Sequence, residues 1–331
     1  MSISEQEIRK QSLNTYKQWA PQWREQASFH GKRFAMHDME ELFYSGVGKA
    51  ALLIGNGYSF EQKIDIIKRN QENVDIIACD KTVGHCIREG IIPKYCILCD
   101  ANVSYEKYLE PYKDKLKDTI LIANVCAATK WASLGNWKKI YFFINRDCLK
   151  SEKEFQELSG CPNTVVAGTN VSNAMVILMT QCDDEGKRNL FGYDKLLLIG
   201  FDYSWKDHYY AFDHDGGGKE HYMKTVYGRN LAGQNVYSSN NLVFSAKWLE
   251  KYIKVFKLNV FQCGEISIFS AKRLTKDLEE QMNYQYRVED SEFLRQTDKM
   301  RIELEGKLKR AKETIVNIFK DHEMKVLGSV T

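Results

Sequence analysis

Proline is scarce in this chain, and neither sign of charge dominates it. Its 331 residues include only four prolines, and 47 lysines and arginines nearly balance 44 aspartates and glutamates. The resulting net charge of +3 does not by itself indicate a nucleic-acid partner. The hydrophobic fraction of 44% is ordinary for a globular protein, and the length is sufficient for one large domain or two ordinary domains.

Long apolar runs are also absent from the sequence, so no segment is predicted to span a bilayer. The N-terminus is charged and has a helical pattern, which differs from the pattern of a signal peptide. We therefore expect a cytoplasmic protein. The nine cysteines are odd in number and most lie within apolar runs, which favours buried, reduced thiols over disulfides.

One pair of cysteines, Cys96 and Cys99, has the spacing of a redox or zinc half-site. A structural zinc site needs a second pair of ligands, and no other pair in the sequence has ligand spacing. On a strand these two positions would also point to opposite faces. The sequence therefore predicts no metal site.

The chain is organised around an alternation of apolar strands and helices that begins at residue 50. Residues 50–54 form a short apolar run without polar alternation, which is typical of a strand buried on both faces. Helix, strand, helix and strand patterns follow at residues 60–70, 74–80, 82–89 and 95–99. This alternation predicts a parallel α/β sheet.

The same alternation continues through most of the chain. Further strands are predicted at residues 119–124, 139–145, 195–199 and 259–263, the last of the sheet, and helices at residues 105–115, 130–134, 171–181 and 242–256. Residues 146–163 are polar and are predicted to be a surface excursion, and residues 203–241 a long functional loop. We therefore predict an α/β fold with a Rossmann-like, mostly parallel sheet and flanking helices.

Helical segments are predicted on both sides of a catalytic domain at residues 46–270. Residues 1–45 have an amphipathic helical pattern, in which Pro21 is predicted to separate two helices. Residues 271–331 are predicted to be a helical extension with a heptad stripe formed by Leu304, Leu308, Ala311, Ile315 and Ile318. Such a stripe packs on the domain or on a second copy of the chain, so a homo-oligomer formed through this helix is one expectation.

Three predicted strands end in residues suited to ligand binding. Gly55-Asn56-Gly57 follows the first strand, Asp80 ends the second, and Asp100-Ala101-Asn102 ends the third. In parallel α/β sheets ligands bind beyond the carboxyl ends of the strands. These residues therefore form the predicted binding edge.

The first of these turns has the chemistry of a nucleotide site. Glycine permits a sharp turn and a close ligand, and the following helix would direct free N–H groups at an anion. Asn56 can donate and accept hydrogen bonds at once, as recognition of a base or sugar requires, and Ser59 is a suitable helix cap. The turn is neither Gly-x-Gly-x-x-Gly nor a P-loop, and a purely structural turn explains its residues equally well.

These residues belong to a longer pattern. It consists of an apolar strand, Gly-x-Gly-x-Ser, a helix, a strand ending in Asp80, and Gly90-Ile91-Ile92-Pro93 before a strand ending in Asp100. The pattern resembles the core of the motility-associated, flagellin-modifying glycosyltransferases and of the MptE-like hydroxymethylpterin pyrophosphokinases in the same domain family. Gly168-Thr169-Asn170-Val171 is similar to that family's glycine–asparagine turn.

A second resemblance adds two spaced motifs. Gly55-Asn56-Gly57-Tyr58-Ser59 is similar to the Gly-Asn-Gly-Pro-Ser of bacterial lipooligosaccharide sialyltransferases. Their Gly-x-Asp-Phe-Tyr segment and the Tyr-Ala-Phe-Asp that follows it resemble Gly200-Phe201-Asp202-Tyr203-Ser204 and Tyr210-Ala211-Phe212-Asp213, at the same spacing. The two likenesses together cover residues 45–270.

The resemblances imply a glycosyltransferase that moves a sugar from a nucleotide-activated donor, such as a CMP- or UDP-sugar, to an acceptor hydroxyl. Tyr203 and Tyr210 would donate hydrogen bonds to the leaving phosphate. The acceptor could be a protein, a glycan or a modified nucleic-acid base. The implied donor-binding residues are Gly55, Asn56, Gly57, Ser59, Asp80, Asp100, Asn102, Gly168, Thr169, Asn170, Ser172, Asp202 and Tyr203.

The resemblance leaves the catalytic base open. The sialyltransferases use a histidine of a mobile loop, and Tyr237 stands at the closest position here. His221 lies in the same loop and has a pKa suited to a base near neutral pH. We therefore predict His221 as base, with Tyr237 and Tyr210 as further catalytic residues. The glycines at 216–218 predict that residues 214–235 act as a lid over the donor.

Two alternatives belong to other classes of function. An MptE-like pyrophosphokinase would hold Mg²⁺ between Asp80 and Asp100, although Ala101-Asn102 supplies no second acid next to Asp100. A catalytically inactive module that only binds nucleotide sugars would explain the loss of the loop histidine. Hydrolysis of donor without acceptor would distinguish an active transferase from such a module.

Overall fold

The structure of the chain is a computed structural model. It describes residues 5–146, 149–165, 168, 170–180, 191–206, 210–212, 225–230, 232–264, 266–269, 273–274 and 278–283. Met1–Tyr284 forms one compact unit. The predicted heptad stripe at residues 304–318 lies outside the described residues, so a helical extension and an oligomer formed through it stay predictions.

A parallel sheet forms the centre of this unit and confirms the predicted Rossmann-like α/β class. In the described part of the chain it has nine strands in the order β11-β10-β7-β1-β2-β3-β4-β5-β6, and every neighbouring pair is parallel. The strands are β1 (Ala50–Ile54), β2 (Asp75–Cys79), β3 (Tyr95–Leu98), β4 (Ile120–Asn124), β5 (Lys139–Asn145), β6 (Thr164–Val165), β7 (Lys195–Ile199), β10 (Val260–Gln262) and β11 (Arg273–Leu274). The prediction that residues 259–263 form the last strand is wrong, because the two-residue edge strand β11 follows; a segment so short has no apolar periodicity to reveal it.

Strand β1 lies between β2 and β7, and its side chains alternate between the two faces of the sheet. Leu52 and Ile54 pack on one face and Leu53 on the other, and all three are fully buried. The registers align Ile54 with Ala78 of β2 and with Ile199 of β7. A strand covered on both faces has to be apolar at every position, which explains the run at residues 50–54.

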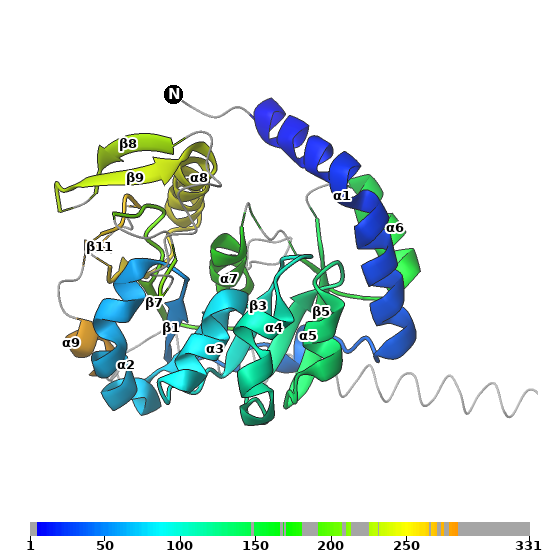
Figure 1. The fold of residues 1–331 in the computed structure, drawn as a ribbon, viewed down its shortest axis with the longest axis horizontal. Helices are drawn as coiled ribbons and strands as arrows, with labels where there is room; N and C mark the ends of the chain where they lie inside the picture. The colour runs from blue at the N-terminus through cyan, green and yellow to red at the C-terminus, as the bar shows by residue number, and fades with distance from the viewer. Residues whose placement is uncertain are drawn as a thin grey trace, which may run out of the picture. The chain divides into compact units, whose positions relative to one another are not determined.

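Helices cover both faces of the sheet. One face carries η2 (Tyr58–Lys63), α2 (Ile64–Asn70), α3 (Asp80–Arg88), α4 (Tyr105–Tyr108), η4 (Glu110–Lys115), α5 (Thr129–Leu134) and α9 (Leu278–Asn283), and η3 (Gln71–Asn73) joins α2 to β2. The other face carries η1 (Met39–Leu42), α7 (Val171–Thr180) and α8 (Asn240–Phe256). Figure 1 is viewed with α3, α4 and α5 in front of the strands.

Two predicted helices are divided in the structure. The helix predicted at residues 60–70 begins as the 3₁₀ helix η2 before α2. The helix predicted at residues 105–115 consists of α4 and η4, and Pro111 stands at the start of η4. Proline has no backbone N–H to continue an α-helix, which explains the second division.

The polar residues 146–163 are not the predicted surface excursion, because most of them form α6 (Leu149–Ser159). Phe155 of this helix is buried, whereas Lys153 and Glu157 form an exposed ion pair one turn apart. The exposed side of an amphipathic helix therefore produced the polar pattern.

Pro21 does not separate two helices as predicted, because α1 (Glu5–Arg33) runs through it. Tyr16 and Trp23, on either side of the proline, both pack against Phe155 of α6, with ring centroids 6.4 and 6.5 Å away. These contacts hold both halves of α1 against one partner and compensate for the hydrogen bond that proline does not donate. Figure 1 shows α1 and α6 side by side.

The loop predicted at residues 203–241 contains a β-hairpin. Strands β8 (Thr225–Arg229) and β9 (Asn235–Ser239) are antiparallel, and the backbones of Trp205 and Tyr237 exchange two hydrogen bonds of 2.8 Å. Ser239 then caps α8 by accepting a hydrogen bond from the Leu242 N–H. The hairpin therefore belongs to regular structure that leads directly into α8.

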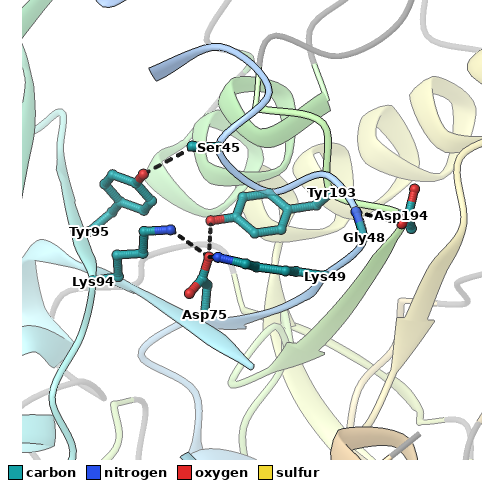
Figure 2. A network of polar contacts seen from close by, with 8 residues as sticks. All are labelled: Ser45, Gly48, Lys49, Asp75, Lys94, Tyr95, Tyr193 and Asp194. Atoms are coloured by element: carbon teal, nitrogen blue, oxygen red, sulfur yellow. Dashed lines mark hydrogen bonds and ion pairs between the residues drawn. The ribbon is translucent and has the colours of Figure 1, made fainter. Parts of the chain in front are cut away.

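The amino ends of the central strands are joined by a network of polar side chains, drawn in Figure 2. The carboxylate of Asp75, at the start of β2, accepts hydrogen bonds from Lys94 Nζ at 2.6 Å and from the Tyr193 hydroxyl at 2.9 Å. Lys49 Nζ lies 3.9 Å from the same oxygen. This edge of the sheet is therefore satisfied by the chain's own side chains.

Among the residues that the structure describes, no helix has both the length and the apolar character that crossing a membrane requires.

Candidate functional site

The turns that follow β1 and β7 are packed against each other at the carboxyl edge of the sheet. The Gly57 N–H donates to the Gly200 carbonyl at 2.9 Å, and Gly55 N–H to the Ile199 carbonyl at 2.8 Å. Gly200 has φ of +72°, and a Cβ built on it would lie 2.1 Å from the Gly55 carbonyl oxygen. Strand order reverses here, with β2 on one side of β1 and β7 on the other, and ligands of open α/β sheets bind at such points.

A buried serine–aspartate pair joins these two turns. Asp202 is 1% exposed, and its carboxylate accepts hydrogen bonds from the Ser59 N–H at 2.8 Å and the Ser59 hydroxyl at 2.5 Å. The Ser59 oxygen in turn accepts from the Gly200 N–H at 2.9 Å. Burial raises the pKa of Asp202 to about 6, although the Ser59 hydrogen bonds oppose the rise. Ser59 therefore does not cap a helix as predicted, because its hydroxyl is bonded to Asp202.

Gly57 is required by packing rather than by a ligand. A Cβ on this residue would lie 2.5 Å from an Asp202 carboxylate oxygen and 2.8 Å from the Gly200 carbonyl oxygen. The space that a larger side chain would enter is therefore filled by the chain itself. Gly57→Val is therefore expected to disrupt the turn.

Replacing Ser59 with alanine is expected to lower the free energy of unfolding by about 1–3 kcal/mol, because Asp202 and the Gly200 N–H both lose a buried partner. Urea unfolding measures the loss. Ser133→Ala is the control, since the Ser133 hydroxyl bonds only the Thr129 carbonyl one turn earlier in its own helix. Equal stability of the two variants would contradict the structural role of the pair.

Next to this satisfied pair lies a buried and unsatisfied one. The side-chain nitrogen and oxygen of Asn56 and the Oδ2 of Asp80 are buried without a hydrogen-bond partner among the described residues. The β1–β2 register places Asn56 and Asp80 two residues beyond the same aligned pair, Ile54 and Ala78. Buried polar atoms are nearly always paired in folded proteins, so these three atoms are candidates for contacts with a ligand.

The Asp80 carboxylate stands at the N-terminus of α3 and interacts with two charged neighbours. Its Oδ1 accepts the Lys81 N–H at 2.7 Å. Burial raises the pKa of Asp80 to about 6; Lys81 lowers it and Asp100 raises it further. Asp75, at the amino end of β2, has three partners in Figure 2. Among the described residues, polar side-chain atoms without a partner therefore lie at the carboxyl edge of the sheet, beside Asp80, and not at the amino edge.

Lys81 and Tyr210 complete this edge. Lys81 Nζ donates to the Tyr210 hydroxyl at 3.2 Å and lies 4.7 Å from the centroid of its ring. Burial opposes the charge on Lys81, but Tyr210 and Asp80 outweigh burial and raise its pKa above the ordinary value. The ammonium is therefore charged at every physiological pH.

The segment at residues 210–212 is tied to the turn after β1. The Ala211 N–H donates to the Asn56 carbonyl at 2.9 Å, and the Phe212 N–H donates to Glu61. The Phe212 ring packs on His85, with centroids 4.7 Å apart, and burial lowers the pKa of His85 to about 4, so the imidazole is neutral. These contacts fix Tyr210 over Lys81.

The turn after β3 is covered by α1. Gln26 Nε2 donates to the Ala101 carbonyl at 2.8 Å, and Gln22 Nε2 donates to Asn102 Oδ1 at 2.7 Å. The Asn102 N–H donates to the Asp100 carboxylate at 2.8 Å. A hollow of about 250 Å³ lies beside this turn, lined by Gln26, residues 101–106 and residues 128–130. Asp100 and Asn102 are both exposed at this edge.

The residues predicted to line the other side of the donor site lie at or near the start of α7. Asn170 Oδ1 accepts the Asn173 N–H at 2.9 Å, which caps the helix that contains Ser172. Gly168 has φ of +71° and packs against Trp248 of α8. Thr169 lies outside the described residues.

Tyr203 has a hydrogen-bond partner within the chain. Its side chain is 6% exposed and its hydroxyl donates to Asn173 Oδ1 at 2.7 Å. The hydroxyl thus has an internal acceptor on α7, and its predicted contact with a leaving phosphate stays a prediction.

Of the other predicted catalytic residues, Tyr237 lies on β9 and is 42% exposed. His221 and most of the predicted lid at residues 214–235 lie outside the described residues, so the assignment of the base and the closure of a lid stay predictions.

The sequence reasoning missed Lys81, Gln22 and Gln26. Lys81 directly follows a strand-ending acid at a predicted helix start, a position from which a cation reaches the carboxyl edge of the sheet. The two glutamines lie four residues apart on α1, so they share one face, but the sequence does not reveal which turn this face covers.

A central parallel sheet with helices on both faces and an unsatisfied polar cluster at its carboxyl edge defines an α/β domain of the Rossmann-like class. A model of the family described as 6-hydroxymethylpterin diphosphokinase MptE-like matches residues 28–208, more than half of the chain. The chain therefore belongs to the MptE-like family.

A solved structure has the same fold. The MAf glycosyltransferase from Magnetospirillum magneticum AMB-1 matches with a TM-score of 0.58 and 17% sequence identity. The match covers 86% of this chain and 41% of that chain, so this chain spans less than half the length of its structural relative. No curated protein matches the sequence.

Proposed function

We propose that the chain is a glycosyltransferase that binds a nucleotide-activated sugar at the carboxyl edge of β1, β2 and β3. The observation that carries this proposal is that the buried side-chain amide of Asn56 and the buried Oδ2 of Asp80 have no hydrogen-bond partner among the described residues. An amide that offers one donor and one acceptor direction suits the edge of a base or a ribose. A carboxylate oxygen without a partner suits a ribose hydroxyl or an exocyclic amino group.

The transfer needs few protein groups. The acceptor oxygen forms a bond to the sugar carbon as the bond from that carbon to the phosphate oxygen breaks, and the electron pair stays on the phosphate. The acceptor proton passes to a general base, for which His221 remains the predicted residue. The matched solved structure is that of a glycosyltransferase, which supports this reaction class.

A second function, phosphoryl or diphosphoryl transfer from ATP, is favoured by the description of the family model. Asp80 and Asp100 interact electrostatically, and a magnesium ion carried by ATP phosphates needs only one or two protein carboxylates. Within the described residues no group of three or more His, Cys, Asp or Glu side chains could hold a metal ion. The two acids therefore fit a metal only together with a bound nucleotide.

Ligand-induced stabilisation separates the two functions. The melting temperature of the protein is measured with CMP-, UDP- and GDP-sugars and with ATP, each in EDTA and in MgCl₂. A nucleotide sugar that stabilises the protein in EDTA supports the glycosyltransferase, whereas stabilisation by ATP alone and only with magnesium supports diphosphoryl transfer.

Asn56→Ala is expected to weaken binding of the stabilising nucleotide about tenfold to a hundredfold, because each hydrogen bond from a buried amide contributes about 1–1.5 kcal/mol. Asn73→Ala is the control, since Asn73 lies before β2 at the opposite edge and bonds Asn283. Titration calorimetry measures both variants. Unchanged affinity in Asn56→Ala would place the site elsewhere.

A further inference from the structure

Lys81, the residue after Asp80, has unused hydrogen-bonding capacity. Lys81 Nζ has three donor directions, and its one hydrogen bond in the described part of the chain goes to Tyr210. No carboxylate of the described residues lies within ion-pair distance of it. A charged, half-buried ammonium without a paired anion is unusual, because burial of a charge is costly unless an opposite charge compensates.

The position of Lys81 is fixed rather than variable. The ring and hydroxyl of Tyr210 hold the ammonium, and the Ala211 and Phe212 backbone bonds hold Tyr210. Lys81 belongs to the first turn of α3, whose nine residues begin at the carboxyl end of β2. The same edge carries the unpartnered Asn56 amide and Asp80 oxygen.

We propose that the Lys81 ammonium, positioned by Tyr210, binds the phosphate that joins the nucleoside to the transferred group, and that this binding needs no divalent metal ion. The inference rests on the proposed function and names the residues that recognise the anionic part of the donor. Asn56 and Asp80 then contact the nucleoside, and Lys81 contacts the phosphate beside it.

The arrangement also suits the chemical step. As the carbon–oxygen bond of the donor breaks, negative charge grows on the phosphate oxygen. A preorganised ammonium stabilises such a charge without reorganising solvent. The ammonium touches the leaving phosphate in this assignment, so Lys81 is a catalytic residue as well as a binding residue.

The test compares nucleotides with nucleosides, because only the former carry the phosphate. Titration calorimetry in EDTA measures the affinities of CMP, UMP and GMP and of the matching nucleosides for the full chain. In Lys81→Met the affinity of the preferred nucleotide is expected to fall at least about tenfold, the usual effect of one charge-assisted contact, while nucleoside affinity changes less than about twofold. Lys81→Arg should keep most of the nucleotide affinity, because it keeps the charge.

A matched control lies at the opposite edge of the sheet. Lys139 starts β5 and lies 4.9 Å from the centroid of the Tyr141 ring, the same kind of contact that Lys81 makes with Tyr210. Lys139→Met should leave nucleotide and nucleoside affinity unchanged. Melting temperatures of the same samples confirm that each variant is folded.

The possible outcomes distinguish a failure of this inference from a failure of the proposed function. A wild-type chain that binds no nucleotide would overturn the proposed function and this inference with it. Nucleotide binding that is unchanged in Lys81→Met, or lost equally for nucleosides, would overturn the phosphate assignment alone. Replacing EDTA with MgCl₂ should change the wild-type affinity less than about twofold, and a larger gain would also overturn the metal-independent assignment.

Discussion

Gly200→Ala is expected to lower the free energy of unfolding by about 3–5 kcal/mol. The residue has φ of +72°, where an alanine costs about 1–2 kcal/mol in backbone strain. Its new Cβ would also stand 2.1 Å from the Gly55 carbonyl oxygen, which is backbone and has no rotamer to move away. The turns after β1 and β7 would have to separate, and the hydrogen bond from Gly57 N–H to the Gly200 carbonyl would break.

Gly160→Ala is a matched control for this prediction. Gly160 has φ of +69°, almost the same backbone conformation, but a Cβ on it would meet no atom within 4 Å. Gly160→Ala should therefore lower the free energy of unfolding by the backbone strain alone, about 1–2 kcal/mol. Urea unfolding of both variants gives the difference, and equal losses would mean that the two turns are not in contact.

Asp80→Asn is expected to stabilise the protein without ligand at pH 8. The pKa of Asp80 is raised to about 6 by burial, so the folded state prefers the protonated carboxyl. This preference contributes to the free energy of unfolding. The contribution is fully present below the ordinary pKa of 3.8 and is lost as the pH rises through 6. An amide of the same shape does not titrate, so the variant should gain on the order of 3 kcal/mol at pH 8 and almost nothing at pH 4.

Measurement at several pH values isolates this effect. Asp202 also has a pKa of about 6, but it titrates in wild type and variant alike and cancels in their difference. Asp75→Asn, at the other end of β2, should instead destabilise, because a neutral amide replaces the charged partner of Lys94 and Lys49. A stability gain in Asp80→Asn that does not depend on pH would contradict the buried, ionised carboxylate.

The same variant is expected to bind nucleotide more weakly. A residue whose replacement increases stability and decreases affinity is one that the fold does not need and the ligand does. Ser59→Ala should show the opposite combination, a loss of stability that follows from its bonds to Asp202 and Gly200.

The sequence predicted the strands of the central sheet except the two-residue strands β6 and β11, and it predicted the edge at which polar residues gather, for a simple physical reason. A strand buried on both faces is apolar throughout, so residues 50–54 and 195–199 are visible as strands, and the residues that end them follow by position. Asn56 and Asp80 were therefore predicted to lie at the same edge of the sheet, and the β1–β2 register places both there.

What the sequence could not show is which polar groups are already satisfied. Ser59 and Asp202 are 143 residues apart, and nothing local indicates that they bond each other rather than a ligand. The hydrogen bond between Tyr203 and Asn173 could not be predicted for the same reason, because these residues are also far apart in the sequence. The helix through Pro21 depends on Tyr16 and Trp23 meeting Phe155, a long-range contact that overrides the local preference of proline.

The central place of β1 has a consequence during synthesis on the ribosome. Strands β2 to β6 can pair in chain order as they are synthesised, but the other edge of β1 stays unpaired until β7 has been synthesised. The turn contact between Ser59 and Gly200 likewise spans 141 residues. Until then a fully apolar strand has an open edge, the arrangement most prone to pairing with another chain. Nascent chains that stop before residue 199 should therefore aggregate or recruit chaperones, although they already carry Asn56 and Asp80.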